Sequence, residues 1–260
     1  SIPESIGKLQ NLETLVLSEY KLKTFPNAIW KLLNLTKMSL GPNPKTQFPD
    51  DLEKMTKLRD LELDRLEVTN FAQYIGKLTS LRKLKLENVI FGGELPNSVS
   101  GLVNLETLEM LGMSSKGLDQ FIGQLTSLRE LSFDYMKVDN LPESIGKLSN
   151  LEKISFSMMP TLKGLPESFG NLSKLKEINV FDHDELMEGW TYNDFTFPES
   201  MGKLTSLENL NLHSTRIKKF PQSMGDLKLK GILIDKQLKN DPTIKRLKSK
   251  GCKIEIIPEG

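Results

Sequence analysis

Leucine and other large apolar residues recur at a fixed spacing along almost the whole chain. Each unit contains a block of the form LxxLxxLxL, in which most positions between the leucines are polar. Successive blocks begin about 23 residues apart, with one longer interval between Leu172 and Leu204. The first residues of the blocks are Leu9, Leu32, Met55, Leu78, Leu102, Leu125, Leu148, Leu172, Leu204 and Leu227. Repetition of this length indicates a solenoid, in which each repeat buries its apolar side against its neighbours.

The end of each block alternates apolar and other residues, as in "TLVL" at 14–17, "DLEL" at 60–63 and "NLNL" at 209–212. Such alternation predicts a short strand with one buried face. Only about 23 residues separate equivalent strands, and each return segment carries its own apolar residues. The strands should therefore be parallel neighbours joined by right-handed connections.

The return segments open with a Leu-Pro or Phe-Pro pair, where proline favours a turn or the first residue of a helix. An Ile-Gly, Phe-Gly or Met-Gly pair follows three residues later, as in 142–146 and 198–202. We predict that these glycines cap the C-terminus of a short helical turn. Residues 148–171, "LSNLEKISFSMMPTLKGLPESFGN", contain the whole unit.

This unit resembles the LPxxIGxLxxLxxLxL class of the leucine-rich repeat family, and the resemblance covers nearly the whole chain. It implies an α/β fold: a right-handed leucine-rich repeat solenoid with a curved parallel β-sheet on its concave face and short helical or 3-10 turns on its convex face. We assign 1–234 to the repeat array and 235–260 to a C-terminal capping helix and strand. The class includes plant intracellular resistance receptors and bacterial repeat proteins, so the resemblance implies protein binding and, by analogy, innate immunity, plant defence and signalling.

One position departs from the family pattern. Members often carry asparagine three residues after the last leucine of the strand, but here only Asn43 does so. Other repeats place mostly apolar residues there, including Met113, Met136 and Met159. We therefore predict a buried apolar column, partly of methionine, in place of an asparagine ladder.

The two ends of the sequence differ. The chain opens at Ser1 in the middle of a repeat without a polar cap, so we expect further repeats or another domain N-terminal to it. Near the other end, Asp241 and Pro242 predict the start of a helix that Gly251 ends, and "CKIEII" predicts a last covering strand.

Composition narrows the possible functions. Lys and Arg number 35 against 34 Asp and Glu, a balance that gives no reason to expect nucleic acid or a membrane surface as partner. The sequence contains no run of 18 apolar residues, which is about the length that a membrane-spanning helix needs. Cys252 is the single cysteine, which fits a reducing compartment and leads us to expect a cytoplasmic location.

No constellation of residues predicts an enzyme or a cofactor. His183 and His213 lie about one repeat apart, close in sequence to Asp182 and Asp184, and could in principle hold a metal ion. Two surface histidines placed by chance explain the pattern better, so we predict no metal site.

The strand positions that point away from the core carry charges of both signs. Acidic Asp60, Glu62 and Asp64 precede basic Lys83 and Lys85 by one repeat, and the pattern continues with Glu109, Glu130, Lys153, Glu177 and His213. A groove for nucleic acid would be uniformly basic with stacking aromatic residues. Mixed charge instead suits a protein partner with its own charge pattern.

Just beyond the strands, four neighbouring repeats carry Leu111, Tyr135, Met158 and Phe181. An apolar cluster rimmed by charge is typical of the centre of a protein interface. These side chains could alternatively fold into the turns.

The long interval contains an insertion at 181–196. The step from Val180 to Phe197 is about twice as long as the equivalent step from Leu212 to Phe220 in the next repeat. The insertion carries Trp190 and Tyr192 among acidic residues, which favours a binding loop. An inert bulge is the alternative.

These patterns predict a non-catalytic module that binds a protein partner through its concave face and adjoining rim, as the sensing or scaffolding segment of a larger protein. One alternative is the substrate-recognition segment of an enzyme whose catalytic domain lies outside this chain. Another is a structural spacer without a ligand.

Overall fold

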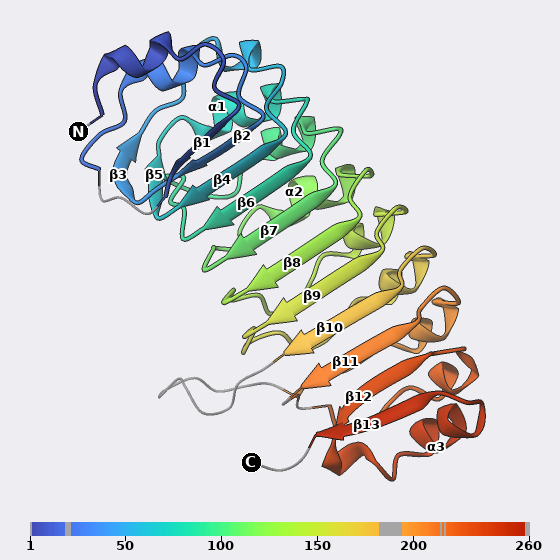
Figure 1. Cartoon of the computed structure of the whole chain (residues 1–260). Coiled ribbons are helices and arrows are strands. Elements are labelled where there is room, and N and C mark those ends of the chain that lie inside the picture. The colour runs from blue at the N-terminus through green and yellow to red at the C-terminus, as the bar shows by residue number, and fades with distance from the viewer. Residues whose placement is uncertain (1, 19–21, 182–193, 214, 216, 258–260) are drawn as a thin grey trace. The chain divides into compact units, whose positions relative to one another are not determined.

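Parallel strands, one from each repeat, form the framework of the chain (Figure 1). The computed structural model describes residues 2–18, 22–181, 194–213, 215 and 217–257, and its backbone contacts divide it into two units, Ser1–Leu128 and Arg129–Gly260. In the first unit the strand order is β1 (Thr14–Leu17), β2 (Lys37–Leu40), β4 (Asp60–Asp64), β6 (Lys83–Glu87) and β7 (Thr107–Leu111). In the second unit it is β8 (Glu130–Asp134), β9 (Lys153–Ser157), β10 (Glu177–Phe181), β11 (Asn209–His213), β12 (Gly231–Asp235) and β13 (Lys253–Ile257). The predicted parallel sheet is confirmed.

The register of the strands follows the leucine pattern. Leu61 pairs with Leu84 and Leu63 with Leu86, so equivalent apolar residues stack on one face of the sheet. These side chains are no more than 1% exposed. Because the side chains of a strand alternate between faces, the residues between the leucines form a second, open face.

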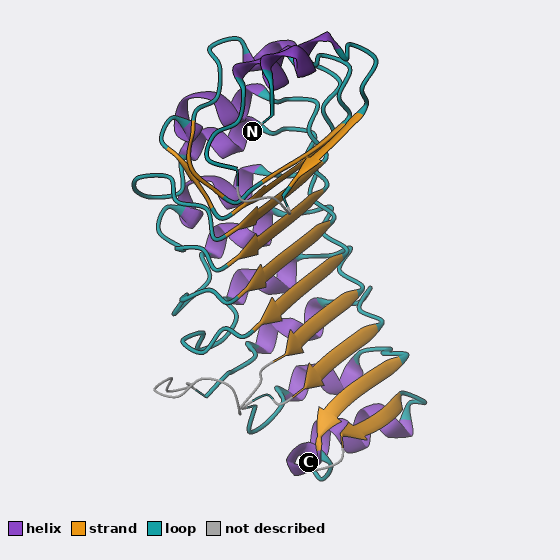
Figure 2. Ribbon diagram, turned by 60° about the vertical axis from the view of Figure 1, so that its left-hand side comes forward, coloured by secondary structure: helices purple, strands orange, loops and turns teal. Residues whose placement is uncertain are grey.

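Short helices cover the buried face in each unit (Figure 2). Most are 3-10 turns: η1 (Glu4–Lys8), η2 (Asn27–Lys31), η3 (Leu52–Lys54), η4 (Ile75–Lys77), η5 (Asn97–Gly101), η6 (Ile122–Gln124), η7 (Glu143–Lys147), η8 (Glu167–Asn171), η9 (Glu199–Lys203), η10 (Gln222–Asp226) and η11 (Lys236–Leu238). Single α-helical turns, α1 (Phe71–Tyr74) and α2 (Leu118–Phe121), precede η4 and η6. The predicted short helical return segments are confirmed.

The predicted role of the glycines in these turns is wrong. Gly146 and Gly202 lie inside η7 and η9, do not have positive φ, and are followed by Leu148 and Leu204 as the capping residues. Their function is close approach, since a Cβ on Gly146 would lie 2.4 Å from the carbonyl oxygen of Ser168 in the next turn. Glycine is therefore needed because successive turns touch through their backbones.

The first unit also has a small second sheet, in which β3 (Asn43–Thr46) pairs in parallel with β5 (Leu66–Val68). Ile90 extends this sheet through a bridge to Glu67. The N–H of Ile90 donates to the carbonyl of Leu66 at 2.8 Å, and the N–H of Val68 donates to the carbonyl of Ile90 at 2.9 Å. These bonds fix the backbone that follows β6.

The buried apolar residues predicted in place of the asparagine ladder are present at five described positions, while Thr215 at the equivalent position is buried but polar. Leu66, Val89, Met113, Met136 and Met159 are all less than 8% exposed. Burial of such side chains stabilises each turn by about 1.5–3 kcal/mol, without the hydrogen bonds that an asparagine would provide.

The predicted terminal helix and strand are present as α3 (Pro242–Ser249) and β13. The Asp241 carboxylate caps the helix by accepting from the N–H of Thr243 at 2.8 Å. Ile244 and Leu247 are buried, and Gly251 has the left-handed φ of 92° that ends the helix.

Candidate functional site

The charges on the open face of the first unit form ion pairs with one another. Lys85 on β6 lies 3.0 Å from Glu62 on β4 and 3.1 Å from Glu87 on its own strand. Lys37 pairs with Asp60 at 3.4 Å, and Lys83 pairs with Glu109 at 2.6 Å. The structure therefore brings together the acidic and basic residues that the sequence placed one repeat apart.

These contacts change the proton affinities of the groups. Partial burial disfavours the charged form of Lys85, but hydrogen bonds to Glu62 and Glu87 outweigh burial and raise its pKa. Burial likewise raises the pKa of Glu62, but the hydrogen bond from Lys85 reverses the sign and leaves that pKa lowered. A hydrogen bond to Glu109 raises the pKa of Lys83.

Asp64 lies apart from this network. It is buried, and its carboxylate accepts hydrogen bonds from the guanidinium of the adjacent Arg65 at 2.8–3.1 Å. Asp64 therefore presents little surface to a partner, although the sequence pattern grouped it with Asp60 and Glu62.

The open face of the second unit carries fewer charges. Lys153 pairs with Glu177 at 2.9 Å, while Glu130 is exposed without an ion pair among the described residues. Burial raises the pKa of Glu177, but hydrogen bonds from Asn179 and Lys153 outweigh burial, so the pKa is lowered.

Next to this ion pair lies a row of hydrogen-bonded amides that sequence reasoning did not single out. Asn211 donates to the Oδ1 atom of Asn179 at 2.7 Å, and Asn179 donates to Ser155 at 3.2 Å and to Glu177 at 2.7 Å. Asn179 is only 4% exposed because its neighbours cover it. The insertion lies between Asn179 and Asn211 in the sequence and lengthens the interval between them beyond one normal repeat. The two amides can be recognised as neighbours only when the repeats are aligned around the insertion.

The residue directly after several strands has a left-handed backbone. Its φ is 48° at Arg65 and 51° at Asn88 in the first unit, and 50° at Tyr135 and 49° at Met158 in the second. The N–H of each donates to the last carbonyl of the next strand, as from Tyr135 to Ser157 at 3.0 Å. Asparagine and glycine tolerate this conformation, whereas tyrosine and methionine do so at a cost of about 1–2 kcal/mol.

The residues of the predicted rim cluster are divided between the two units. Leu111 ends β7 in the first unit and is half-buried, whereas Tyr135, Met158 and Phe181, also half-buried, belong to the second unit. The Phe181 ring lies 6.4 Å from the imidazole of His213. The side chains of the rim are thus neither fully exposed nor folded entirely into the turns.

The insertion preserves the repeat register on both sides. Val180 pairs with Leu212, Phe181 pairs with His213, and Thr196 forms a bridge with Gly164 in the preceding repeat. Asp194 pairs with Lys218 at 2.5 Å. Trp190 and Tyr192, predicted as binding residues, lie outside the described residues.

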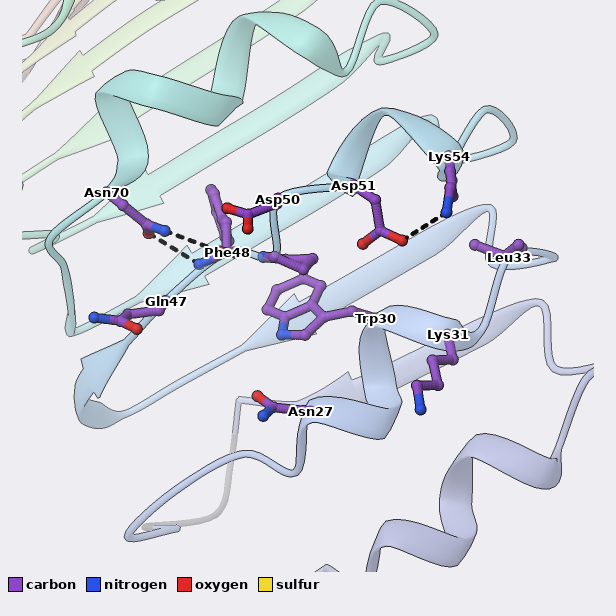
Figure 3. Close-up of a pocket in the computed structure, with 11 residues that line it drawn as sticks. Asn27, Trp30, Lys31, Leu33, Gln47, Phe48, Asp50, Asp51, Lys54 and Asn70 are labelled. Atoms are coloured by element: carbon purple, nitrogen blue, oxygen red, sulfur yellow. Dashed lines mark hydrogen bonds and ion pairs between the residues drawn. The ribbon is translucent and has the colours of Figure 1, made fainter.

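A cavity of about 540 Å³ lies between η2 and the segment that leads into η3 (Figure 3). Comparison of the repeats explains its position, because Trp30 and Glu53 stand where other turns have glycine. The indole of Trp30 packs edge-on against Phe48, with 5.4 Å between the ring centroids, and lines the cavity (Figure 3), whereas a glycine would let the turns meet. The replacement of the turn glycine by Trp30 and Glu53 can be found in the sequence, provided that the turns of successive repeats are aligned.

Four of the polar side chains that line the cavity, those of Asp50, Asp51, Lys54 and Asn70, are engaged with protein atoms. Asp51 pairs with Lys54 at 2.9 Å, and Asp50 accepts a hydrogen bond from the Tyr74 hydroxyl. Asn70 both donates to and accepts from the backbone of Phe48, at 2.8 and 2.9 Å. The cavity is accounted for by packing of the Trp30 side chain and does not call for a ligand.

The described ranges offer no group of three His, Cys, Asp or Glu side chains that could hold a metal ion. His183, Asp182 and Asp184 lie outside those ranges. Cys252 is buried, and burial raises the pKa of its thiol. Within the same ranges, every helix is too short or too polar to cross a lipid bilayer.

The repeated strand and turn, with an open face beside a rim of strand-end residues, define a leucine-rich repeat solenoid. Sequence comparison agrees: the family described as "Leucine-rich repeat region" matches residues 1–114, 73–193 and 113–228. The chain belongs to the leucine-rich repeat family. A comparison with curated protein sequences finds no significant match.

Solved structures share the fold at low sequence identity. An internalin of Listeria monocytogenes is 17% identical with a TM-score of 0.59, over 97% of this chain and 77% of that one. A leucine-rich repeat protein of Leptospira interrogans is 21% identical with a TM-score of 0.51, over 97% and 74%. The Arabidopsis receptor kinase HAESA, solved with the peptide hormone IDA and the co-receptor SERK1, is 22% identical with a TM-score of 0.61, over 86% of this chain and 38% of that one.

Proposed function

We propose that this chain is a non-catalytic recognition module that binds a protein partner through the open face and the rim of the second unit, meaning Tyr135, Met158 and Phe181. The observation that carries the proposal is the left-handed backbone at Tyr135 and Met158, with φ near 50°. Both positions would be less strained with asparagine, as at Asn88, yet they hold large, half-buried side chains. Strain retained at a surface site is a common mark of function.

The electrostatics of each unit support the same interpretation. In the first unit, Lys85 and Lys83 are neutralised by carboxylates of the same face, so they define a patterned but balanced surface. Such a surface sets the orientation of a partner more than its affinity. The second unit offers aromatic, methionine and amide groups, which can supply the binding energy.

Leucine-rich repeat proteins are typically protein-interaction modules, and the HAESA structure contains a peptide and a protein partner. By analogy we propose a sensing or scaffolding role within a larger cytoplasmic protein, of the kind found in immune receptors. The rival, a recognition segment attached to a catalytic domain, differs only in what the full coding sequence contains, and that sequence distinguishes the two.

The experiment compares partner affinity with stability. The partner is first captured with the wild-type chain from its native host and identified, and its Kd is then measured for the double variant Tyr135→Asn/Met158→Asn. Asparagine adopts the left-handed conformation readily, so the double variant should unfold at about the same urea concentration as the wild type. Loss of two interface side chains should raise the Kd about tenfold or more.

Val103→Asn is the matched control, because Val103 is an apolar residue that is 57% exposed away from the rim and open face. It should leave the Kd unchanged. A double variant that binds the partner as tightly as the wild type would show that the rim is not the interface.

A further inference from the structure

A second cavity, of about 370 Å³, lies between the turns that follow β6 and β7 in the first unit. Its wall is mostly apolar, apart from Asn88 and Ser114: Val89, Leu95 and Met113 are buried, and Phe91 is half-buried. The Phe91 ring is held by Phe71, at 4.4 Å between centroids. The cavity is therefore preformed and fits an apolar group.

Gly93 lines this cavity and has no structural requirement for glycine. It does not have positive φ, and a Cβ at this position would meet no atom within 4 Å. Gly117, by contrast, has φ of 86° and would place a Cβ 2.4 Å from the carbonyl of Leu95. Gly93 therefore lines the cavity beside open space that a side chain at this position could occupy.

Ile90 stands at the lip of the cavity and is 61% exposed. Its backbone is fixed by the bridge to Glu67, and because bridge partners in parallel strands project to the same side, the two side chains share one surface. An exposed isoleucine alone needs no explanation, but one beside an open apolar cavity extends the surface that a partner could bury.

The carboxylates beside the cavity differ from those of the open face. Glu67 and the exposed Glu94 form no ion pair among the described residues, whereas Glu62, Glu87 and Glu109 are all paired. Lys116, whose carbonyl accepts the N–H of Leu95, also pairs with neither Glu67 nor Glu94. Glu67 is the bridge partner of Ile90 and Glu94 follows Gly93 in the chain, so two carboxylates without an ion pair adjoin residues that line the cavity.

We infer that this cavity is a docking site for one large apolar side chain of a protein partner, presented beside a basic residue. The inference rests on the proposed function and names the chemistry of the partner segment. The apolar side chain enters past Gly93 and contacts Ile90, while the neighbouring lysine or arginine lies near Glu67 or Glu94. Charge complementarity selects a basic segment over an acidic one.

The test uses three blocked peptides, acetyl-Lys-Phe-Lys-amide, acetyl-Lys-Ser-Lys-amide and acetyl-Glu-Phe-Glu-amide, and the full chain with labelled isoleucine and methionine methyl groups. The first peptide should shift the Ile90 and Met113 methyl signals in a saturable way. The serine and glutamate peptides should each bind about fivefold or more weakly, because one lacks the apolar side chain and the other meets like charge.

Two variants locate the binding. Gly93→Leu places a large apolar side chain beside the cavity and should weaken binding of the phenylalanine peptide acetyl-Lys-Phe-Lys-amide about tenfold. Gly93→Ala, its matched control, leaves the cavity open and should bind this peptide like the wild type. Ile90 also lines the cavity, so Ile90→Ser should weaken binding of the same peptide. This variant replaces Gly93→Leu as the test if Gly93→Leu lowers the thermal midpoint of unfolding. Equal binding of all three peptides, no saturable shift, or unchanged binding in Gly93→Leu and Ile90→Ser would each overturn the inference. These peptides do not test Tyr135 and Met158, so failure here leaves the proposed function standing.

Discussion

The contact between successive 3-10 turns gives a prediction whose size can be worked out from the structure. Gly170 in η8 faces η9, and a Cβ on Gly170 would lie 2.4 Å from the carbonyl oxygen of Ser200 and 2.6 Å from its Cβ. A carbon normally approaches a carbonyl oxygen no closer than about 3.3 Å. Gly170→Ala therefore forces the two turns apart by nearly 1 Å, and Ser200 is buried, so its side chain has little room to move.

Two effects set the expected change in the free energy of unfolding. Overpacking of this kind costs about 1–3 kcal/mol. Alanine also restricts the unfolded chain, which stabilises the fold by about 0.4–1 kcal/mol where the backbone suits it. Gly170 does not have positive φ, so both effects apply, and the net loss should be about 1–2 kcal/mol.

Gly93→Ala separates the two effects, because Gly93 also lacks positive φ but has no neighbour within 4 Å of a Cβ. The free energy of unfolding of this control should rise by about 0.4–1 kcal/mol. Urea unfolding followed by circular dichroism measures both variants against the wild type. If Gly170→Ala proves as stable as Gly93→Ala, the turns are free to separate and close approach is not the reason for the glycine.

Two further predictions concern charge and capping. Lys85→Met leaves Glu62 and Glu87 without their shared cation and should cost about 0.5–1 kcal/mol at neutral pH, since the group is partly exposed. The pKa of Glu62 is lowered in the fold, so the ionised carboxylate stabilises the folded state at pH values above the unfolded pKa of about 4.3. This stabilisation is lost as the pH falls through the lowered pKa of the folded state. The difference between wild type and Lys85→Met should accordingly shrink below about pH 4, and urea unfolding at several pH values checks this; a constant difference would mean that the ion pair does not act through Glu62. Asp241→Ala removes the cap of α3 and the acceptor of the Phe220 N–H, 3.1 Å away, and should cost about 1–2 kcal/mol, whereas Asp241→Asn should retain most of the stability. Hydrogen exchange of the α3 amides measures this local effect, and equal protection in Asp241→Ala would contradict it.

The candidate site was only partly predictable from sequence. The pairing of Lys85 with Glu62 follows from the register alone, because residues one repeat apart must be neighbours in this fold. The isolation of Asp64 does not follow, since it depends on Arg65 turning back in a left-handed conformation. Tyr135 and Met158 were predicted as rim residues, but nothing in their local sequence indicates the φ that makes them informative.

The sequence by itself determined the repeat, the parallel strands, the buried leucine faces and the terminal helix. A strict apolar period leaves only one way to bury every repeat, so local pattern and overall fold agree. The tertiary structure decided how close the turns come at Gly146 and Gly170, where Trp30 opens a cavity, and why Gly93 leaves another one unfilled. Those features depend on distances of a few tenths of an ångström between neighbouring repeats, which no residue type specifies until its neighbour is in place.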